Sequence, residues 1–252
     1  MDNYLNFENK TILITGGSSG IGQQTAITLS KLGAKVILVA RSKERLQETV
    51  DKLDGSGHTF YCLDLSDTLA IEPAVKQIVD ECGPVDGLVY AAGIDISLPI
   101  QLFKPEKVQE VFAVNYFGFI ETIRQLCKKG RFNYGMRIVG LSSVASKCGD
   151  KIHTAYSASK AAMDASVRCL AKELADKGIF INTIAPAMTD TNIFKEFYSK
   201  HGDEAKNELI KRQYLGIGNV EDVANAIAFL LSDGARFMTG STMMYDGGFT
   251  SN

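Results

Sequence analysis

The sequence predicts an α/β fold, in which a doubly wound parallel sheet of about seven strands carries helices on both faces. Two observations support this prediction. Short apolar runs alternate with amphipathic stretches along all 252 residues, and no repeat or linker interrupts them. This alternation is typical of parallel sheets that are covered on both faces. The chain is also 45% hydrophobic and 22% charged, so it can bury a large core, and α/β folds of this length often form one domain.

The elements follow from hydrophobic periodicity and from glycine punctuation. The first strand is expected at 10–15, and a glycine turn connects it to an amphipathic helix that ends at Gly33. By the same patterns, further strands are expected at 35–40, 58–63, 85–90, 136–142, 179–184 and 241–245. Helices are expected at 21–32, 43–53, 68–82, 104–128, 154–177 and 220–231, with an extra helical excursion at 191–214. In such a sheet, ligands bind at the carboxyl ends of the strands.

Charge and cysteine content exclude several classes of function. A net charge of −2 gives no electrostatic reason to expect nucleic acid or an anionic membrane as a partner, so a small molecule is expected. The five cysteines are scattered without a C-x-x-C pair, which favours buried thiols in a reducing compartment and no metal site. Residues 1–10 are unlike a signal peptide, and no apolar run approaches the roughly 18 residues of a membrane helix. We therefore expect a cytoplasmic protein.

Tyr156 and Lys160 lie four positions apart on one predicted helix, so their side chains project from the same face. A fixed positive charge stabilises phenolate, and we therefore expect Lys160 to lower the pKa of Tyr156. Tyr156 is then a candidate for proton transfer. Taken alone the pair is weak evidence, because tyrosine and lysine at this spacing are also common on a solvated helix face.

A glycine-rich segment follows the first strand. Gly16, Gly20 and Gly22 stand in the spacing G-x-x-x-G-x-G, and the next predicted helix begins there. Glycines let backbone N–H groups approach an anion, and a helix N-terminus adds a favourable dipole. The segment is a candidate phosphate cradle, and the alternative is a tight turn. The spacing differs from the G-x-G-x-x-G dinucleotide fingerprint.

With these motifs in this order, nearly the whole chain resembles the classical short-chain dehydrogenase/reductase family. The segment T-G-G-S-S-G-I-G at 15–22 matches the T-G-x-x-x-G-x-G of that family. The other matches are Asp64-Leu65, Ala91-Ala92-Gly93, Asn115, Ser143, Tyr156-x-x-x-Lys160, Pro186 with Thr191, and Asp246-Gly247-Gly248. The resemblance implies one Rossmann-type domain over 1–252 and a homotetramer in which helices 104–128 and 154–177 meet symmetry mates.

The resemblance also implies the chemistry, which is hydride transfer between a nicotinamide and a carbonyl or secondary alcohol. Tyr156 would supply the proton, Ser143 would hydrogen-bond the carbonyl oxygen, and Lys160 would hold the ribose and keep the phenol acidic. Asn115 would position a water that links Lys160 to solvent. Two alternatives remain open: Asn115 caps or kinks its helix, and Ser142 rather than Ser143 faces the site.

The residues expected to bind the cofactor lie along the same motifs. They are Gly16, Ser18, Ser19, Gly20, Ile21, Gly22, Arg41, Ser42, Asp64, Leu65, Ala91, Ala92, Gly93, Tyr156, Lys160, Pro186 and Thr189.

The end of the second strand indicates which cofactor binds. A carboxylate there would repel a ribose 2′-phosphate, whereas an arginine attracts it. Ala40 stands where many relatives have Asp, and Arg41 and Ser42 follow. NADP(H) is therefore preferred and NAD(H) remains possible. The alternative is that Arg41 is an ordinary surface residue, and Ser19 lacks the second charge found in some NADP-dependent relatives.

Further positions carry expectations of their own. Asp64 would accept a hydrogen bond from the adenine amine, or it caps the next helix. Tyr90 stands where the family has Asn, which puts the sheet hydrogen bonds of that Asn in doubt. Thr189 would meet the carboxamide, after an Ala187 that replaces the usual glycine. Residues 187–215 are expected to form a substrate lid, with Ile193, Phe194, Phe197, Tyr198 and Tyr214 as its apolar part, although these aromatics are equally suited to anchoring a helix on the core. His153 is expected near the pocket without a catalytic role.

The substrate is the least determined part. Relatives reduce 3-oxoacyl thioesters, steroids, sugars and small ketones. A basic cluster could receive an acyl carrier protein, which favours a 3-oxoacyl thioester, and solvated helix ends are the commoner explanation. The cluster is Lys128, Lys129, Arg131 and Lys177. A nucleotide-sensing module without turnover is the alternative from another class, and it usually lacks the tyrosine or the lysine that this chain has.

Overall fold

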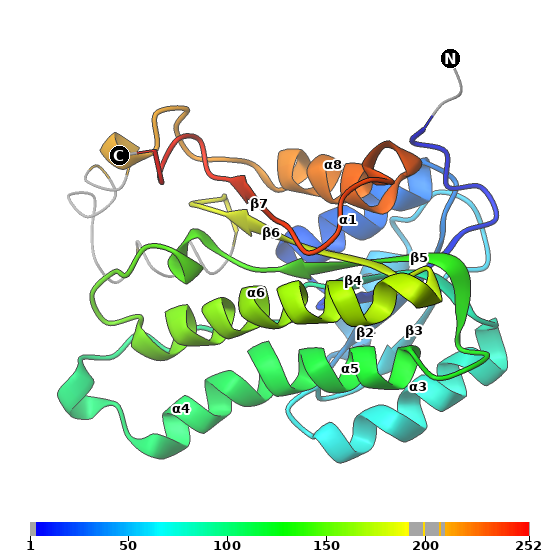
Figure 1. Cartoon of the computed structure of the whole chain (residues 1–252), viewed down its shortest axis with the longest axis horizontal. Coiled ribbons are helices and arrows are strands. Elements are labelled where there is room, and N and C mark those ends of the chain that lie inside the picture. Colours follow the sequence, from blue (N-terminus) through cyan, green and yellow to red (C-terminus); the bar gives the residue numbers. More distant parts are fainter. Residues whose placement is uncertain (1–3, 192–198, 200–206, 208–209, 252) are drawn as a thin grey trace.

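The computed structural model describes residues 4–191, 199, 207 and 210–251. Its centre is one sheet of seven parallel strands in the order β3-β2-β1-β4-β5-β6-β7 (Figure 1). The strands are β1 Thr11–Thr15, β2 Lys35–Ala40, β3 Thr59–Cys62, β4 Val85–Tyr90, β5 Phe132–Leu141, β6 Phe180–Pro186 and β7 Thr242–Tyr245. The doubly wound parallel sheet predicted from the sequence is confirmed. The order reverses between β1 and β4, which is where ligands bind in such sheets.

Helices cover both faces of the sheet, with α1 and α8 on one side and α3, α5 and α6 on the other (Figure 1). Their bounds are α1 Gly20–Lys31, α2 Lys43–Val50, α3 Thr68–Cys82, α4 Pro105–Phe112, α5 Gly118–Leu126, α6 Thr154–Leu174 and α8 Val220–Leu231. A π-helical turn, η2 Ala113–Phe117, joins α4 to α5. Single 3-10 turns occur at η1 Ile100–Leu102, η3 Val144–Ser146, η4 Ala175–Lys177 and η5 Asp233–Ala235.

The core has two halves because successive strand residues point to opposite faces. Leu13 of β1 packs with the buried residues beneath α3, α5 and α6, whereas its neighbours Ile12 and Ile14 pack with those of α1 and α8. Both faces of the central strands are therefore buried. This explains why these strands are continuous apolar runs in the sequence rather than alternating ones.

The structure differs from the sequence prediction mainly in two places. The helix expected at 104–128 is interrupted by the π turn at Ala113–Phe117, and the fifth strand begins at Phe132 rather than 136. Hydrophobic periodicity does not detect the π turn, because its i→i+5 hydrogen bonds alter the helical repeat over only five residues. The additional first part of β5 is irregular. Gly135 has a left-handed backbone there, and the register of β5 against β4 shifts between Val85 and Gly87.

Two further expectations concern the lid and membrane-spanning helices. Most of the excursion expected at 191–214 and most of the lid expected at 187–215 lie outside the described residues. Across the part of the chain that the structure describes, no helix has the length and apolar character needed to cross a membrane.

Candidate active site

A cleft of about 1380 Å³ opens at the carboxyl edge of the sheet. It is lined by the turns that follow β1, β2, β3, β4, β5 and β6, so six segments far apart in the sequence meet there. Every residue expected to bind a cofactor lines this cleft, and so do Ser143, Tyr156 and Lys160. Asn115 is absent from its lining, although its neighbour Val114 is part of the wall.

The glycine segment packs too closely for side chains. Gly16 has φ +68°, and a Cβ on it would lie 2.8 Å from the backbone of Ala91 and Ala92. A Cβ on Gly22 would collide with the carbonyl of Gly16. Helix α1 then begins at Gly20, and Ser19 at its N-cap makes no side-chain capping bond within the described chain. The first N–H groups of α1 thus lie against a backbone cradle, which suits the pyrophosphate of a dinucleotide.

Two guanidinium groups flank the cleft at the start of α2. Arg41 and Ser42 line the cleft as expected, and Arg45 lines it as well. The Ser42 hydroxyl accepts a hydrogen bond from the Arg45 N–H and donates one to Glu44. Ser42 therefore caps α2. Sequence analysis missed Arg45, although its position four residues after Arg41 was a usable signal.

Asp64 and Leu65 lie on the wall after β3. Asp64 Oδ1 accepts hydrogen bonds from the Ser66 N–H and hydroxyl at 2.9 and 2.7 Å. These bonds lower the pKa of Asp64, and the charge of Arg41 acts in the same direction. Helix α3 is capped by Asp67 instead. The alternative in which Asp64 caps that helix is wrong.

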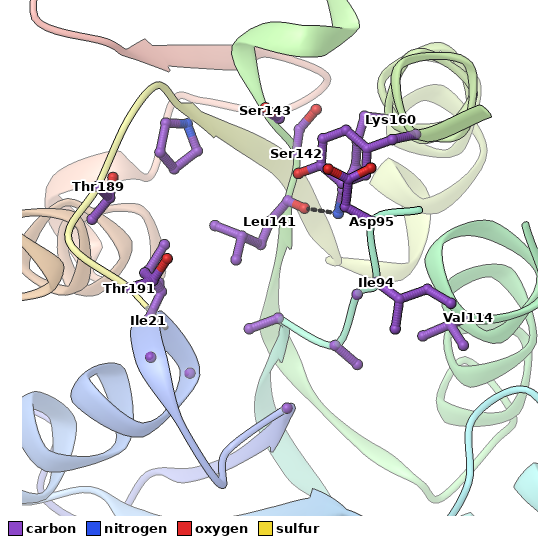
Figure 2. Close-up of a pocket in the computed structure, with 18 of the residues that line it drawn as sticks. Ile21, Ile94, Asp95, Val114, Leu141, Ser142, Ser143, Lys160, Thr189 and Thr191 are labelled. Carbon is purple, nitrogen blue, oxygen red and sulfur yellow. Dashed lines mark hydrogen bonds between the residues drawn. The ribbon is translucent and has the colours of Figure 1, made fainter. Parts of the chain in front are cut away.

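Ser143, Tyr156 and Lys160 lie at the end of the cleft formed by β5 and α6. Lys160 is 3% exposed, and its Nζ donates a hydrogen bond of 2.6 Å to the carbonyl of Leu141. The same Nζ lies 5.7 Å from the centroid of the Tyr156 ring. Figure 2 shows Ser142, Ser143 and Lys160 on one side of the cleft, facing Thr189 and Thr191.

The two neighbouring serines differ in their contacts. Ser143 hydrogen-bonds Tyr156 and also accepts from the Ala145 N–H at 3.2 Å. Ser142 Oγ is buried and has no hydrogen-bond partner among the described residues. Ser143 is therefore the serine that contacts the phenol.

The protonation of the pair differs from the expectation. Burial raises the pKa of Tyr156 to about 12, against the lowering effect of the Ser143 hydrogen bond. Burial also lowers the pKa of Lys160 to about 8. The expected lowering of the phenol pKa by Lys160 is therefore not found in the protein alone. Desolvation disfavours both charged forms, and it is the largest cause of each shift.

Asn115 lies inside the π turn and is fully buried. Its amide donates to the Ile94 carbonyl at 3.0 Å and accepts from the Ile94 N–H at 2.8 Å. It also donates to Ser159 Oγ at 3.0 Å, which joins it to α6. A Cβ on Gly93 would lie 3.3 Å from Asn115 Oδ1 and 3.4 Å from Lys160 Nζ, so this glycine lets the two side chains approach each other. Asn115 thus occupies the irregular turn of its helix and does not cap it.

Tyr90 provides a tether where the family has Asn. Its hydroxyl donates a hydrogen bond of 2.6 Å to the Val114 carbonyl in the π turn, and its ring packs edge-on against Phe119 at 5.3 Å. Gly118 leaves room for it, because a Cβ there would lie 2.5 Å from the Tyr90 hydroxyl. Tyr90 therefore ties β4 to the turn that carries Asn115.

Tyr90→Phe is expected to lower the free energy of unfolding by about 1 kcal/mol, because the hydrogen bond between the Tyr90 hydroxyl and the part-buried Val114 carbonyl is lost. Urea denaturation measures the change. Tyr134→Phe is the matched control, since Tyr134 is 87% exposed, and it should change stability by less than about 0.5 kcal/mol. Equal effects in the two variants would contradict the tether.

The segment after β6 closes the cleft on its other side. Pro186, Ala187, Met188 and Thr189 line it, and the Thr189 hydroxyl donates to the Ala187 carbonyl at 3.3 Å. Gln213, which sequence analysis did not identify, holds the segment by accepting from the Met188 N–H and donating to its carbonyl, both at 3.0 Å. Of the expected lid residues, Tyr214 is exposed, and Ile193, Phe194, Phe197 and Tyr198 lie outside the described residues.

The cleft is also lined by an imidazole and a carboxylate. His153 lines the cleft as expected, and it pairs with Asp95, which sequence analysis missed. An acidic residue two positions after the conspicuous A-A-G segment was the only sequence signal for Asp95.

A parallel sheet with a candidate phosphate cradle at one end of its cleft, and with Tyr156, Ser143 and the buried Lys160 at the other, is the arrangement of a nicotinamide-dependent dehydrogenase or reductase. Comparison with known proteins agrees. Residues 16–250 match the family model described as Enoyl-(Acyl carrier protein) reductase. The chain therefore belongs to the short-chain dehydrogenase/reductase family, as expected from its motifs, and is an NAD(P)-dependent oxidoreductase that acts on CH–OH donors.

Relatives cover almost the whole chain. An L-xylulose reductase of Caenorhabditis elegans is 36% identical over 98% of this chain and 98% of its own length. The 3-oxoacyl-(acyl-carrier-protein) reductase FabG of Escherichia coli (strain K12) is 33% identical over 97% and 98%. Among solved structures, a 3-oxoacyl (acyl-carrier-protein) reductase from Agrobacterium tumefaciens C58 with NADP bound superposes with a TM-score of 0.88 at 26% identity, covering 97% of this chain and 96% of that one.

Proposed function

We propose that this protein reduces the carbonyl group of a small molecule with NADPH, and that the reverse reaction oxidises the secondary alcohol. One observation carries the proposal. Tyr156, Lys160 and Ser143 meet at one end of the cleft, and the glycine segment with Arg41 lines the same cleft. A bound nicotinamide dinucleotide would supply the hydride.

The chain's own residues would perform the remaining steps. Tyr156 donates its proton to the carbonyl oxygen, and Ser143 donates a hydrogen bond to that oxygen as negative charge develops on it. Lys160 holds the ribose hydroxyls and stabilises the phenolate that is left. Asn115 holds the loop at Ile94 and binds Ser159 of α6 through hydrogen bonds. It also positions a water that returns a proton to Tyr156.

The cofactor-binding roles are proposed for the residues predicted from the sequence. The glycine segment and the start of α1 hold the pyrophosphate, with Ser18, Ser19 and Ile21 beside it. Asp64 and Leu65 contact the adenine, and Ala91, Ala92 and Gly93 allow close approach of the ribose. Pro186 and Thr189 hold the carboxamide.

NADP(H) is the preferred cofactor in this proposal, and NAD(H) is accepted more weakly. Arg41 and Arg45 line the cleft beside Ser42, and Ala40 places no carboxylate at the end of β2. Arg41 lowers the pKa of Asp64, so its positive charge acts on this part of the wall. Two guanidinium groups suit a 2′-phosphate. The Agrobacterium relative, which is solved with NADP, supports the same choice.

Purified protein is expected to oxidise NADPH when it is given a suitable carbonyl compound. The measurement is a loss of absorbance at the nicotinamide band across a panel of 3-oxoacyl thioesters, ketoses, steroids and small ketones. Tyr156→Phe is the control for turnover at this site. If the protein binds NADPH but oxidises it with no compound of the panel, a nucleotide-sensing module without turnover is favoured.

An acyl carrier protein as the substrate carrier has weaker support. The Escherichia coli relative bears the name of such a reductase, and the basic cluster could meet an acidic protein. However, Lys128 pairs with Glu72 at 2.7 Å, and Arg131 donates to the side chain of Gln125 at 3.1 Å. Two members of the cluster are thus already engaged within the chain.

Assembly, domain organisation and location complete the proposal. Residues 1–252 form one domain with a lid at 187–215, and four copies form a homotetramer. Support for assembly comes from Phe117, which is 50% exposed, and from a hollow between α5 and α6. The hollow is lined by Ile120, Ala165, Ser166, Cys169 and Leu170. The five unpaired cysteines are compatible with a reducing compartment, the cytoplasm.

A further inference from the structure

A carboxylate and an imidazole pair in the wall of the cleft. Asp95 follows β4, His153 precedes α6, and Asp95 Oδ2 lies 2.9 Å from His153 Nδ1. The Ser97 hydroxyl donates a hydrogen bond of 3.2 Å to the same carboxylate oxygen. Both Asp95 and His153 line the cleft, with side chains 16% and 18% exposed. The proposed mechanism uses neither of them.

This pair lies beside the groups that would act on the carbonyl. The rings of His153 and Tyr156 have centroids 6.5 Å apart. The negative charge of Asp95 acts on both Tyr156 and Lys160, where it raises the pKa of each. Figure 2 shows Asp95 next to Lys160, on the same side of the cleft as Ser143. A substituent next to a carbonyl held by Tyr156 and Ser143 therefore falls near Asp95.

One oxygen of Asp95 lacks a donor. Oδ2 takes the bonds from His153 and Ser97, whereas Oδ1 is buried and has no hydrogen-bond partner among the described residues. Buried polar atoms in folded proteins are almost always paired, and an exception calls for an explanation. A ligand that brings a hydrogen-bond donor to this wall would supply the missing partner after a small rotation of the carboxylate.

The charges around Asp95 favour a neutral donor over a cation. The hydrogen bond to Asp95 raises the pKa of His153, so the imidazolium form is stabilised beside the carboxylate. Lys151 and Lys160 also line the cleft, and Asp150 is paired with Arg212. Basic side chains thus already lie around Asp95, and a hydroxyl group supplies a donor without adding further positive charge.

We propose that Asp95, held by His153 and Ser97, binds a hydroxyl group on the carbon next to the reacting carbonyl, and that the substrates are neutral hydroxylated ketones such as ketoses. A 3-oxoacyl thioester has no hydroxyl on the carbons beside its reacting carbonyl, so it offers Asp95 no hydroxyl donor at that position. This inference rests on the proposed carbonyl reduction and narrows its substrate class.

Two ketones of equal length test the inference. D-erythrulose and 2-butanone both have four carbons with the carbonyl at the second, and only erythrulose carries hydroxyl groups. The wild-type kcat/KM with NADPH is expected to be at least about 100-fold higher for erythrulose, because a site built to bind a hydroxyl rejects an analogue without it. Asp95→Leu should lower this ratio by at least about tenfold, and Asp95→Asn, which keeps an acceptor oxygen, should lower it less.

The ratio of the two kcat/KM values separates hydroxyl binding by Asp95 from the effect of its charge on the catalytic groups. Asp95 also affects the pKa values of Tyr156 and Lys160, and that effect applies to both ketones equally. Asp150→Asn is the matched control, since it removes another carboxylate that lines the cleft, and it should change the ratio by less than about twofold. Equal losses on both ketones in Asp95→Leu would overturn the subsite.

A binding measurement keeps the inference separate from the proposed function. Calorimetry of D-erythrulose with the Tyr156→Phe variant and NADPH measures affinity without turnover. If Asp95→Leu weakens erythrulose binding by at least about tenfold, the subsite is supported, even if the wild-type protein reduces neither ketone. A wild-type protein that reduces neither ketone would count against the proposed function alone. Absence of erythrulose binding in the Tyr156→Phe background would overturn the inference.

Discussion

Replacing Tyr156 with phenylalanine is expected to lower kcat for ketone reduction by about 10³-fold, because a positioned acid contributes about 10²–10⁴-fold to such a reaction. Phenylalanine keeps the ring and fills the same buried volume. It removes only the hydroxyl that Ser143 hydrogen-bonds. Initial rates of NADPH oxidation at saturating ketone measure the loss.

Binding and stability should survive this substitution. The dissociation constant for NADPH, measured by fluorescence, is expected to stay within about threefold of the wild-type value, since in the proposed mode other segments of the cleft would hold the phosphates and the adenine. Tyr116→Phe is the matched control, because the Tyr116 hydroxyl bonds to Ser166 and Tyr116 does not line the cleft. Turnover near the wild-type rate in Tyr156→Phe would remove Tyr156 from the mechanism.

The fold was largely predictable because its signals are local. Each buried strand is a short apolar run, and glycines such as Gly16 and Gly33 mark the ends of elements through left-handed backbone. The π turn was not predictable, because it depends on contacts between distant segments. Asn115 reaches across to Ile94 and Ser159, and Tyr90 holds the Val114 carbonyl from the end of β4.

The candidate site was predictable as a set of motifs, but its electrostatics were not. The spacing of Tyr156 and Lys160 places them on one helix face, yet it carries no information about burial. Burial decides the outcome here, since it raises the pKa of Tyr156 to about 12 and lowers that of Lys160 to about 8. Asp95 was missed for a different reason. Its partner His153 lies far along the sequence, and only the folded chain brings the two together.

These two pKa values have a consequence for the proposed mechanism. With the phenol at about 12 and the amine at about 8, the protein alone keeps Tyr156 protonated near neutral pH. That state suits proton donation, which is what carbonyl reduction requires. Alcohol oxidation needs the phenolate instead. The pKa of Tyr156 must then fall, and this requires more positive charge near the phenol than the chain itself supplies.

The double substitution Arg41→Ala with Arg45→Ala is expected to weaken NADPH binding by about 10²–10³-fold, because hydrogen bonds to a charged phosphate are worth about 1.5–3 kcal/mol each. NADH lacks the 2′-phosphate, so its dissociation constant should change by less than about threefold. Isothermal titration calorimetry with both cofactors measures the two changes. Each single variant should show part of the loss, and the two losses need not add, because both guanidinium groups would hold one phosphate.

A neighbouring cation gives the control for this prediction. Lys43→Ala removes a positive charge from the first turn of the same helix, but Lys43 does not line the cleft. It should weaken NADPH binding by less than about threefold, through long-range charge that salt screens. The loss in the double variant should persist in 0.15 M salt, since it comes from direct contact. If NADPH and NADH lose affinity equally, Arg41 and Arg45 do not bind the 2′-phosphate, and the preference for NADP(H) has no basis in this end of the cleft.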